Sequence, residues 1–514
     1  MRGIITLCAL VFIFLVQNPI QADVIQVPAD SSTIQSGIEG TSDGDTVLVA
    51  RGHYHERISF LGKGILVASN FIYDKDTSTI DSTIIDAEID LIGTNDSASV
   101  VFFVSGEDSS SGIFGFTIRN GRGLKFGEYS YGGGIICFSS CPQIGFNKIV
   151  NNYANYGGGI CCIAGDLSPR INGNHLIENQ ADVGGAILCE RSSPLIVDNV
   201  IWGNHAERKG GGVFFKLCSP SIIDNHLENN TTDGFGGGIC GHSGSLTLLG
   251  NKIVGNTCIT EGGGLYCASL VPATIKYNIF NGNMAEYGGG IYTANCSSLI
   301  SNNTVVKNFA THEGGGIYIG GLGYDPAIVN NIVCLSPSGE GIWCGVDRAP
   351  VISFNDVWGN ASSNFHGCPT GVGDTTWATN FNDTPCDSFN NIIRDPLYAD
   401  TLDYELLCNS PCIDAGDPGI YVTPDNGGCR IDMGAYEYPY IIGDANSDGL
   451  VTPRGSRTGA ISEGDIIYLV NYLFRTGPKP CPYHAADANC DGVVNVADVV
   501  CLINCLFRGG NLPC

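Results

Sequence analysis

From Gly236 to Asn256 the chain reads Gly-Gly-Gly-Ile-Cys-Gly-His-Ser-Gly-Ser-Leu-Thr-Leu-Leu-Gly-Asn-Lys-Ile-Val-Gly-Asn, and this frame returns every 25 to 27 residues. Most copies open on three glycines and an aliphatic residue and close on two asparagines. The third glycine, or its replacement, falls at Gly134, Gly159, Ala186, Gly212, Gly238, Gly264, Gly290, Gly316 and Gly341. The asparagine pairs are Asn147/Asn152, Asn174/Asn179, Asn199/Asn204, Asn225/Asn230, Asn251/Asn256, Asn278/Asn283, Asn303/Asn308 and Asn355/Asn360. Such a register predicts a solenoid, because each unit must stack on its neighbours to bury an apolar face.

The pattern within each copy is that of short β-strands. Apolar and polar residues alternate with a period of two around the aliphatic position, and no part of the unit has a helical period. Glycine permits turns with positive φ. Asparagine tolerates left-handed conformations and bonds nearby backbone, so stacked asparagines can form a ladder. We therefore predict an all-β fold of parallel strands, with each coil about 4.8 Å above the last.

These repeats resemble the parallel β-helix repeats of the pectate-lyase-like superfamily. The Gly-Gly-Ala-Ile motif at Gly184–Ile187 is also similar to repeats of polymorphic outer-membrane autotransporters. The resemblance implies a right-handed parallel β-helix over residues 23–441, with regular repeats at about 131–360 and a closing segment at about 361–441. This fold carries lyases, hydrolases, adhesins and scaffolds, so it does not by itself indicate an activity.

Charge and the amino-terminal residues indicate where the protein acts. A formal charge of −26 argues against nucleic acid and anionic membranes as partners, and it disfavours a polyanionic substrate unless Ca²⁺ bridges the two. Residues 1–22 have the features of a secretory signal: Arg2, an apolar run at Ile4–Val16, and Ala22 as a cleavage point. We therefore expect a secreted, extracellular or cell-surface protein with no membrane insertion after signal removal. Beyond Cys8, 22 of the 23 cysteines remain, a number that suggests disulfides in an exported chain.

A short helix is expected near the amino terminus, from a capping box at Ser32–Gln35 to a stop at Gly40. It would cover the open end of the solenoid and block edge pairing. Shortly afterwards come His53, His55 and Glu56, which are either metal ligands or an exposed turn.

Parity assigns each side chain of the repeat to the inside or the outside. The third residue after the glycines should point inward, and this column contains Cys137, Cys162, Cys189, Cys267 and Cys344. Neighbours one coil apart lie within reach of a disulfide, and they can equally pack as small buried thiols. The second residue should point outward, and its column includes Phe214, Tyr266, Tyr292, Tyr318 and Trp343. These rings either stack on the sugars of a glycan or serve as cross-strand neighbours of one another.

The fourth residue places Glu190, Lys216 and His242 on three consecutive coils, all pointing outward. An acid, an ammonium and an imidazole side by side can perform acid–base chemistry on a sugar, or they form a cross-strand ion pair. Neither the clustered aspartates of pectate lyases nor the aspartate trio of polygalacturonases is recognisable. Further along, the carboxylates of the closing segment are expected to cap turns; they are Asp414, Asp417, Asp432 and Glu437.

Residues 442–514 contain two acidic loops, each followed by an apolar helix. In the second loop the Ca²⁺ ligands of an EF-hand-type site would be Asp487, Asn489, Asp491, the Val493 carbonyl, Asn495 and Asp498. The first loop begins with Asp444, Asn446 and Asp448, and an insertion at Pro453–Ser462 displaces its last ligand, Asp465. Helices are expected at Ile466–Phe474 and Val499–Phe507. The duplicated units resemble a type I dockerin, which implies Ca²⁺ as cofactor and a cohesin-like module as partner.

Two functions are compatible with these features. One is breakdown of a polysaccharide by a lyase or hydrolase that uses Glu190, Lys216 and His242. The other is a non-catalytic, adhesin-like or scaffold protein in which the β-helix is a rigid binding rod.

Overall fold

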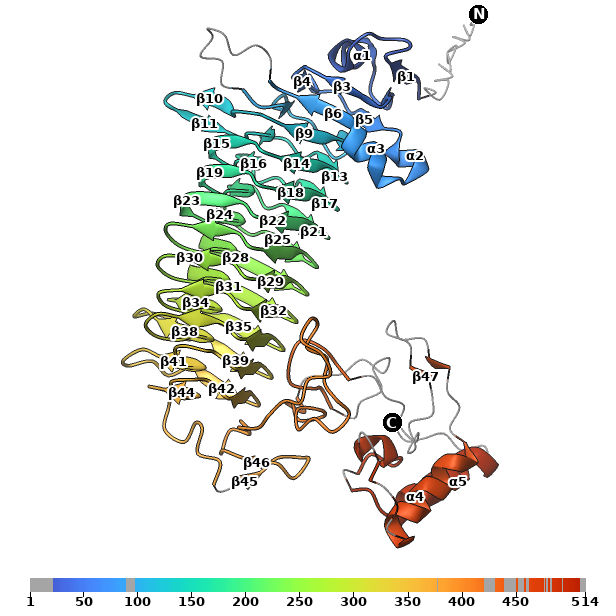
Figure 1. Cartoon of the computed structure of the whole chain (residues 1–514), viewed down its shortest axis with the longest axis vertical. Helices are drawn as coiled ribbons and strands as arrows, with labels where there is room; N and C mark the ends of the chain where they lie inside the picture. The colour runs from blue at the N-terminus through green and yellow to red at the C-terminus, as the bar shows by residue number, and fades with distance from the viewer. Residues whose placement is uncertain are drawn as a thin grey trace, which may run out of the picture.

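The computed structural model describes residues 22–88, 98–376, 378–419, 430–438, 450–451, 457–458, 462–475, 477, 479–480, 483–491 and 493–508. Within them the chain winds into a β-solenoid of about 13 turns, stacked along the long axis of the molecule (Figure 1). The predicted parallel coils are confirmed. The expected signal sequence up to Gln21 and the first acidic loop at 444–449 lie outside the described residues.

The coil that contains Glu190 shows the repeating plan. β20 (Ile187–Glu190) and β21 (Leu195–Val197) belong to a 23-stranded sheet. β22 (Val200–Trp202) belongs to a 12-stranded sheet and β23 (His205–Lys209) to a 9-stranded sheet. Strands of successive coils pair in parallel; β20 pairs with β24 (Val213–Cys218) from Ile187↔Val213 to Glu190↔Lys216. Equivalent side chains therefore stand in files along the solenoid.

The strands after the glycine triplets form one face. They are β12 (Ile135–Phe138), β16 (Ile160–Ile163), β20, β24, β28 (Ile239–Leu249), β31 (Leu265–Lys276), β34 (Ile291–Ala294), β38 (Ile317–Gly320) and β41 (Ile342–Cys344). Their first residues belong to the solenoid core, and so do their third residues except Gly241 and Thr293, which are also buried. Cys137, Cys162 and Cys189 lie one above another as free thiols, so packing is the correct alternative for this column.

Glycine is required in the turns for two different reasons. Gly236 has φ of +69°, which disfavours residues with a side chain. At Gly237 a Cβ would lie 2.6 Å from the Gly263 carbonyl oxygen of the next coil, closer than atoms can approach. The first glycine of the turn is therefore required by its backbone conformation, and the second by the close approach of the next coil.

Two buried asparagine ladders hold the coils in register. Asn179 donates from its backbone N–H and from Nδ2 to Oδ1 of Asn204, at 2.9 and 3.0 Å, and Nδ2 also donates to the Ile149 carbonyl at 2.9 Å. One ladder comprises Asn152, Asn179, Asn204, Asn230, Asn256, Asn283 and Asn308. The other comprises Asn147, Asn174, Asn199, Asn225, Asn251, Asn278, Asn303, Asn331, Asn355 and Asn391. The sequence frame predicted these ladders and omitted Asn331 and Asn391.

Helix α1 (Ile34–Gly40) covers the amino-terminal end, next to β1 (Val24–Val27) and β2 (Thr46–Val49). Its cap is Thr33, paired reciprocally with Ser36, one residue later than the predicted box at Ser32–Gln35. Gln35 does not close the box, because its amide bonds the Ser59 backbone of a neighbouring coil.

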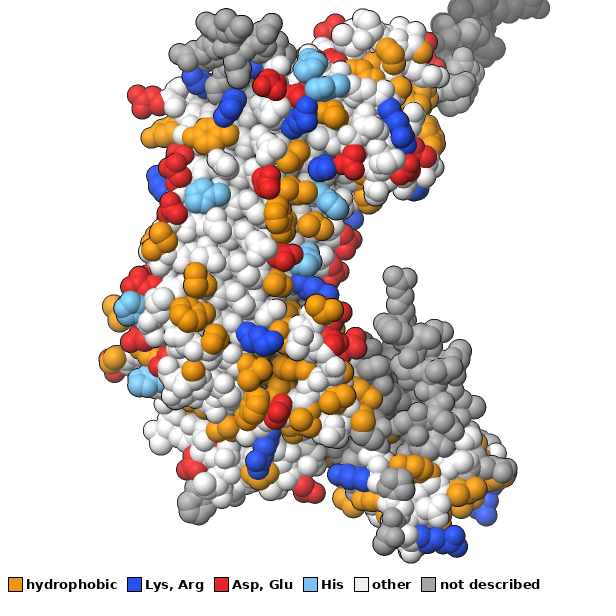
Figure 2. Space-filling model, in the orientation of Figure 1, with side chains coloured by type: hydrophobic (Ala, Val, Ile, Leu, Met, Phe, Trp, Pro, Cys, Tyr) orange, Lys and Arg blue, Asp and Glu red, His pale blue; other side chains and the backbone are white. Residues whose placement is uncertain are grey.

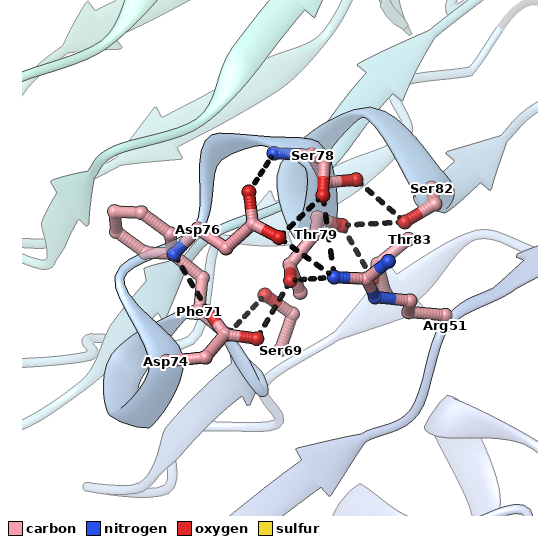
Figure 3. Close-up of polar contacts among 9 residues, drawn as sticks. All are labelled: Arg51, Ser69, Phe71, Asp74, Asp76, Ser78, Thr79, Ser82 and Thr83. Carbon is pink, nitrogen blue, oxygen red and sulfur yellow. Dashed lines mark hydrogen bonds and ion pairs between the residues drawn. The ribbon is translucent and has the colours of Figure 1, made fainter.

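Two short helices project from the first coils. They are α2 (Phe71–Asp74) and α3 (Thr77–Ser82). Figure 3 shows the Arg51 side chain pointing toward the α2–α3 segment. Its Nη2 donates to Asp76 at 3.2 Å and to Thr79 at 2.8 Å. Asp76 also accepts the Ser78 backbone N–H, which starts α3.

The closing segment folds back along the 12-stranded sheet. Apolar side chains from β32 (Ile279–Asn281), β36 (Thr304–Val306) and β40 (Ile332–Cys334) form a second core with the segment. From the closing segment, that core contains Cys386, Ile392, Tyr404, Leu406, Cys412, Ile413, Ala415, Met433 and Ala435. Its carboxylates accept backbone N–H groups, as expected: Asp432 caps Asp414 and Tyr438, and Glu437 caps Asp432.

Beyond the solenoid lie α4 (Glu463–Arg475), a 3₁₀ turn (Tyr483–Ala486) and α5 (Val496–Arg508). The two helices contact each other around a small apolar core that includes Leu469 and Leu502. Both predicted helices are confirmed, and each begins about one turn earlier than expected. The additional turn follows from capping: Asp465 bonds the Ser462 N–H and Asp498 bonds the Asn495 N–H, at equivalent helix positions.

Candidate functional site

The structure brings Glu190, Lys216 and His242 into one surface cleft. They occupy matching positions of β20, β24 and β28, paired Glu190↔Lys216 and Lys216↔His242. The cleft has a volume of about 470 Å³ and is lined by Tyr131, Tyr156, Val183, Leu188, Glu190, Arg208, Lys209, Phe214, Lys216 and His242. Lys216 Nζ lies 3.6 Å from Glu190 Oε1, and both side chains are more than a third exposed. The ion pair is therefore open to solvent and contributes little stability.

The electrostatic surroundings of His242 favour the neutral imidazole. Burial, followed by the charges of Lys209 and Lys216, lowers the pKa of His242 below its usual value. The ring also packs against Tyr266, with ring centroids 5.7 Å apart. At neutral pH this imidazole is consequently a proton acceptor within reach of solvent.

The cleft contains more positive than negative charge. Arg208 and Lys209 come from β23, on the 9-stranded sheet, and Lys216 comes from β24. Arg208 lies 3.9 Å from Asp182, and Lys209 Nζ lies 5.8 Å from the Phe235 ring centroid. On the molecular face in Figure 2, by contrast, acidic and basic side chains are interspersed. The cleft is thus a local cationic site on an acidic chain.

The repeat pattern did not predict the tyrosines and basic residues that line the cleft, Tyr131, Tyr156, Arg208 and Lys209. Tyr131, Tyr156, Val183 and Lys209 each immediately precede a glycine triplet or its equivalent, so they form one more file. The signal is present in the repeat frame, one position before the first glycine of each triplet. It was overlooked because only residues after the glycines were assigned to a surface.

The predicted aromatic column forms a ladder in which rings cover one another. Ring centroids are 5.2 Å apart for Tyr266–Tyr292, 4.9 Å for Tyr292–Tyr318 and 4.4 Å for Tyr318–Trp343, with planes within 11° of parallel. Phe214 is separate from this stack and lies in the cleft floor, only 5% exposed. Because the ladder rings lie face to face, they present edges to the surface. Glycan binding by these rings stays a prediction. The contacts that the rings make are with one another across neighbouring strands, as the second alternative expects.

The two amino-terminal histidines lie beside Asp86, and Glu56 was the wrong carboxylate. Glu56 instead accepts the first backbone N–H groups of α1, from Ile34 and Gln35. Ligand atoms of His53, His55 and Asp86 lie within 4.8 Å of one another. Although burial opposes it, hydrogen bonds from Asn120, the Glu88 backbone, His53 and Arg119 lower the pKa of Asp86 to about 2.

Arg119 determines what this cluster can hold. Its Nε donates to Asp86 Oδ2 at 2.7 Å, on the same oxygen that His53 contacts at 2.9 Å. Oδ1 accepts from Asn120 and from the Glu88 backbone. A permanent guanidinium charge therefore lies against the carboxylate oxygen that a divalent cation would share with His53, and the hydrogen-bond network links the first coils.

The second acidic loop has oxygen donors suited to Ca²⁺. Asp498 is buried and accepts the backbone N–H groups of Asn489 and Asn495 at 3.1 and 2.7 Å. Asp491 accepts the Val493 N–H, and the Asp487 carboxylate accepts the Asp491 N–H. Burial, with the charges of Asp487 and Asp491, raises the pKa of Asp498. The loop thus gathers carboxylate and amide oxygens around Asp498, and these are donors of the kind that the predicted Ca²⁺ prefers.

No protein family, curated protein or solved structure matches this chain. Within the part of the chain that the structure describes, no helix combines the length and apolarity needed to cross a membrane.

Proposed function

We propose that the protein binds an acidic polysaccharide in the cleft of Glu190, Lys216 and His242 and cleaves it by β-elimination. The observation that carries this proposal is the shared cleft, in which His242, whose imidazole pKa is lowered, lies with three cationic side chains, Arg208, Lys209 and Lys216. The overall charge of −26 speaks against polyanions in general, whereas the cleft supplies the local positive charge that a sugar carboxylate requires.

Each group has a distinct part in this step. Arg208 and Lys209 neutralise the sugar carboxylate and so acidify the neighbouring C–H. His242 takes that proton, and the electron pair forms a carbon–carbon double bond as the bond to the glycosidic oxygen breaks. Lys216 gives its proton to the departing oxygen, while Glu190 orients the ammonium from 3.6 Å. The products are a sugar with a free hydroxyl and an unsaturated sugar acid, so atoms and electrons balance.

The solenoid and the carboxyl-terminal module complete the proposal. We assign the solenoid to the right-handed β-helices of the pectate-lyase-like type, and residues 442–514 to a Ca²⁺-binding, dockerin-like module that docks on a cohesin-like partner. Export is supported by the disulfide bonds at Cys408 and Cys490.

Turnover on carboxylated polysaccharides tests the mechanism. Polygalacturonate, alginate and hyaluronan, with dextran as neutral control, are followed by reducing ends and by absorbance of unsaturated products. His242→Ala should lower kcat by a factor of about 100 or more. His226→Ala, which removes a half-buried histidine from the 12-stranded sheet, is the matched control and should leave kcat unchanged. Wild-type activity should persist below pH 6.5, because the imidazole has to be protonated before activity is lost.

Full activity in His242→Ala would refute this assignment of the base. A second candidate function is a non-catalytic glycan-binding rod, favoured by the self-stacked ladder from Tyr266 to Trp343. Retention of the protein on a polysaccharide without any product would support that alternative.

A further inference from the structure

A β-hairpin departs from the regular coil at the amino-terminal side of the cleft. β10 (Leu124–Phe126) pairs antiparallel with β11 (Tyr129–Tyr131), whereas the other pairings of the 9-stranded sheet are parallel among the described residues. The hairpin stands at the amino-terminal end of that sheet (Figure 1). It joins the solenoid through Tyr131, which pairs with Tyr156. The hairpin is therefore continuous with the cleft wall.

One face of this hairpin is aromatic. Phe126 and Tyr129 are directly opposite each other, and so are Leu124 and Tyr131, so all four side chains share a face. Phe126 is 45% exposed and Tyr129 is 46% exposed. Exposed apolar groups that cluster beside a cleft are typical of ligand-binding surfaces.

Both rings pack on tyrosines that line the cleft. Phe126 lies 5.7 Å from the Tyr131 ring centroid, and Tyr129 lies 5.5 Å from that of Tyr156, each nearly edge to face. Tyr131 and Tyr156 stack on each other at 4.9 Å. The two exposed rings are thus supported by their contacts with Tyr131 and Tyr156. These contacts orient the rings in the absence of a ligand, which lowers the entropic cost of binding.

A third ring stands in the same file as the candidate catalytic residues. Phe138 pairs with Ile163, and Ile163 pairs with Glu190, so Phe138 lies two coils from Glu190. Phe138 is 37% exposed, with its ring centroid 5.6 Å from that of Phe126. We define Phe126, Tyr129 and Phe138 as the aromatic platform. A chain lying along this file from His242 through Glu190 reaches the platform about two coil spacings, or roughly 10 Å, further on.

We propose that the aromatic platform is a carbohydrate subsite, which receives the apolar face of a sugar ring belonging to the same polysaccharide as the sugar in the cleft. This inference rests on the proposed function for the position of the polysaccharide. The ligand is inferred from the position of the platform beside the cleft. Tyr131 and Tyr156 belong to the cleft wall and also contact the platform rings. The file of side chains that contains Lys216 and Glu190 ends at Phe138 of the platform. The platform holds the chain, and the cleft performs the chemistry. The exposed rings of this platform also differ from the ladder from Tyr266 to Trp343, whose faces are covered.

Two measurements separate the platform from the catalytic proposal. Retardation of the full-length protein in native gels containing polygalacturonate, alginate or hyaluronan reports binding, and product formation reports chemistry. Phe126→Ala/Tyr129→Ala should weaken retardation and raise KM by about tenfold with kcat unchanged. Phe126→Tyr/Tyr129→Phe keeps both rings and should restore binding. Tyr73→Ala removes a 67% exposed ring from the distant helix α2 and should have no effect.

The outcomes are distinguishable. Retardation that disappears in the double alanine variant supports the platform even where no polysaccharide is cleaved. Unchanged retardation in that variant, or a wild-type protein that no gel retards, overturns it. A wild-type dimer in analytical ultracentrifugation that the double alanine variant abolishes would assign these rings to self-association instead, and would equally overturn the subsite.

Discussion

Asp356 is a carboxyl group buried between the solenoid and its closing segment. It begins β43 (Asp356–Trp358), where Oδ1 accepts the Arg394 N–H at 3.1 Å and Oδ2 contacts Cys412 Sγ at 3.2 Å. Burial raises the pKa of Asp356 to about 7. Near neutral pH this residue is therefore held partly protonated by its surroundings, which links the attachment of the closing segment to pH.

Stability should fall as the pH rises through this range. In the unfolded chain the carboxyl ionises near pH 4, so between about pH 4 and pH 7 unfolding releases a proton and becomes easier. The accumulated cost approaches about 4 kcal/mol. Asp356→Asn should reduce the fall in Tm between pH 5 and pH 8 by roughly 5 °C. Scanning calorimetry checks this, with exposed Asp347→Asn as control; an unaltered pH dependence in Asp356→Asn would contradict it.

At the scale of elements, the asparagine ladders bind one coil to the next. Asn179 is fully buried, and its Oδ1 accepts both the backbone N–H and Nδ2 of Asn152 at 3.1 and 3.0 Å. A hydrophobic replacement of similar size would leave these donors buried without an acceptor, which costs about 1–3 kcal/mol for each group.

Asn179→Leu should therefore destabilise the solenoid by about 3 kcal/mol or more. Chemical denaturation followed by circular dichroism measures the effect, and Gln180→Ala, the exposed neighbour on β19 (Gln180–Val183), is the matched control. Because repeats unfold cooperatively with their neighbours, the loss should lower the main transition instead of adding a separate one. Equal midpoints for the two variants would show that the ladder contributes no net stability.

At the scale of the molecule, the solenoid and the carboxyl-terminal helices have separate apolar cores. Ca²⁺ is expected to stabilise only the core of the carboxyl-terminal helices. Burial, together with the charges of Asp487 and Asp491, raises the pKa of Asp498, and a cation bound to the folded loop at 487–498 would compensate these buried negative charges.

Isothermal calorimetry should show Ca²⁺ binding that Asp487→Ala/Asp498→Ala abolishes. The same variant should lose the Ca²⁺-dependent rise in the thermal transition of the helices, while the solenoid transition stays constant. Asp233→Ala/Glu207→Ala, which removes two exposed carboxylates from the solenoid, controls for non-specific charge. Binding that survives in Asp487→Ala/Asp498→Ala would refute the ligand assignment.

The repeat frame by itself determined the solenoid, the inward cysteine file, the asparagine ladders and the file of Glu190, Lys216 and His242. These depend on local periodicity, which fixes alternation within a strand and register between coils. Only the tertiary structure decided which outward positions are covered. Phe214 is buried, and the rings from Tyr266 to Trp343 stack on one another. The 9-stranded sheet places Arg208 and Lys209 in the same cleft as His242. The periodicity specifies which residues are stacked, whereas exposure depends on how neighbouring sheets and an irregular hairpin meet, and such contacts join residues that no repeat spacing relates.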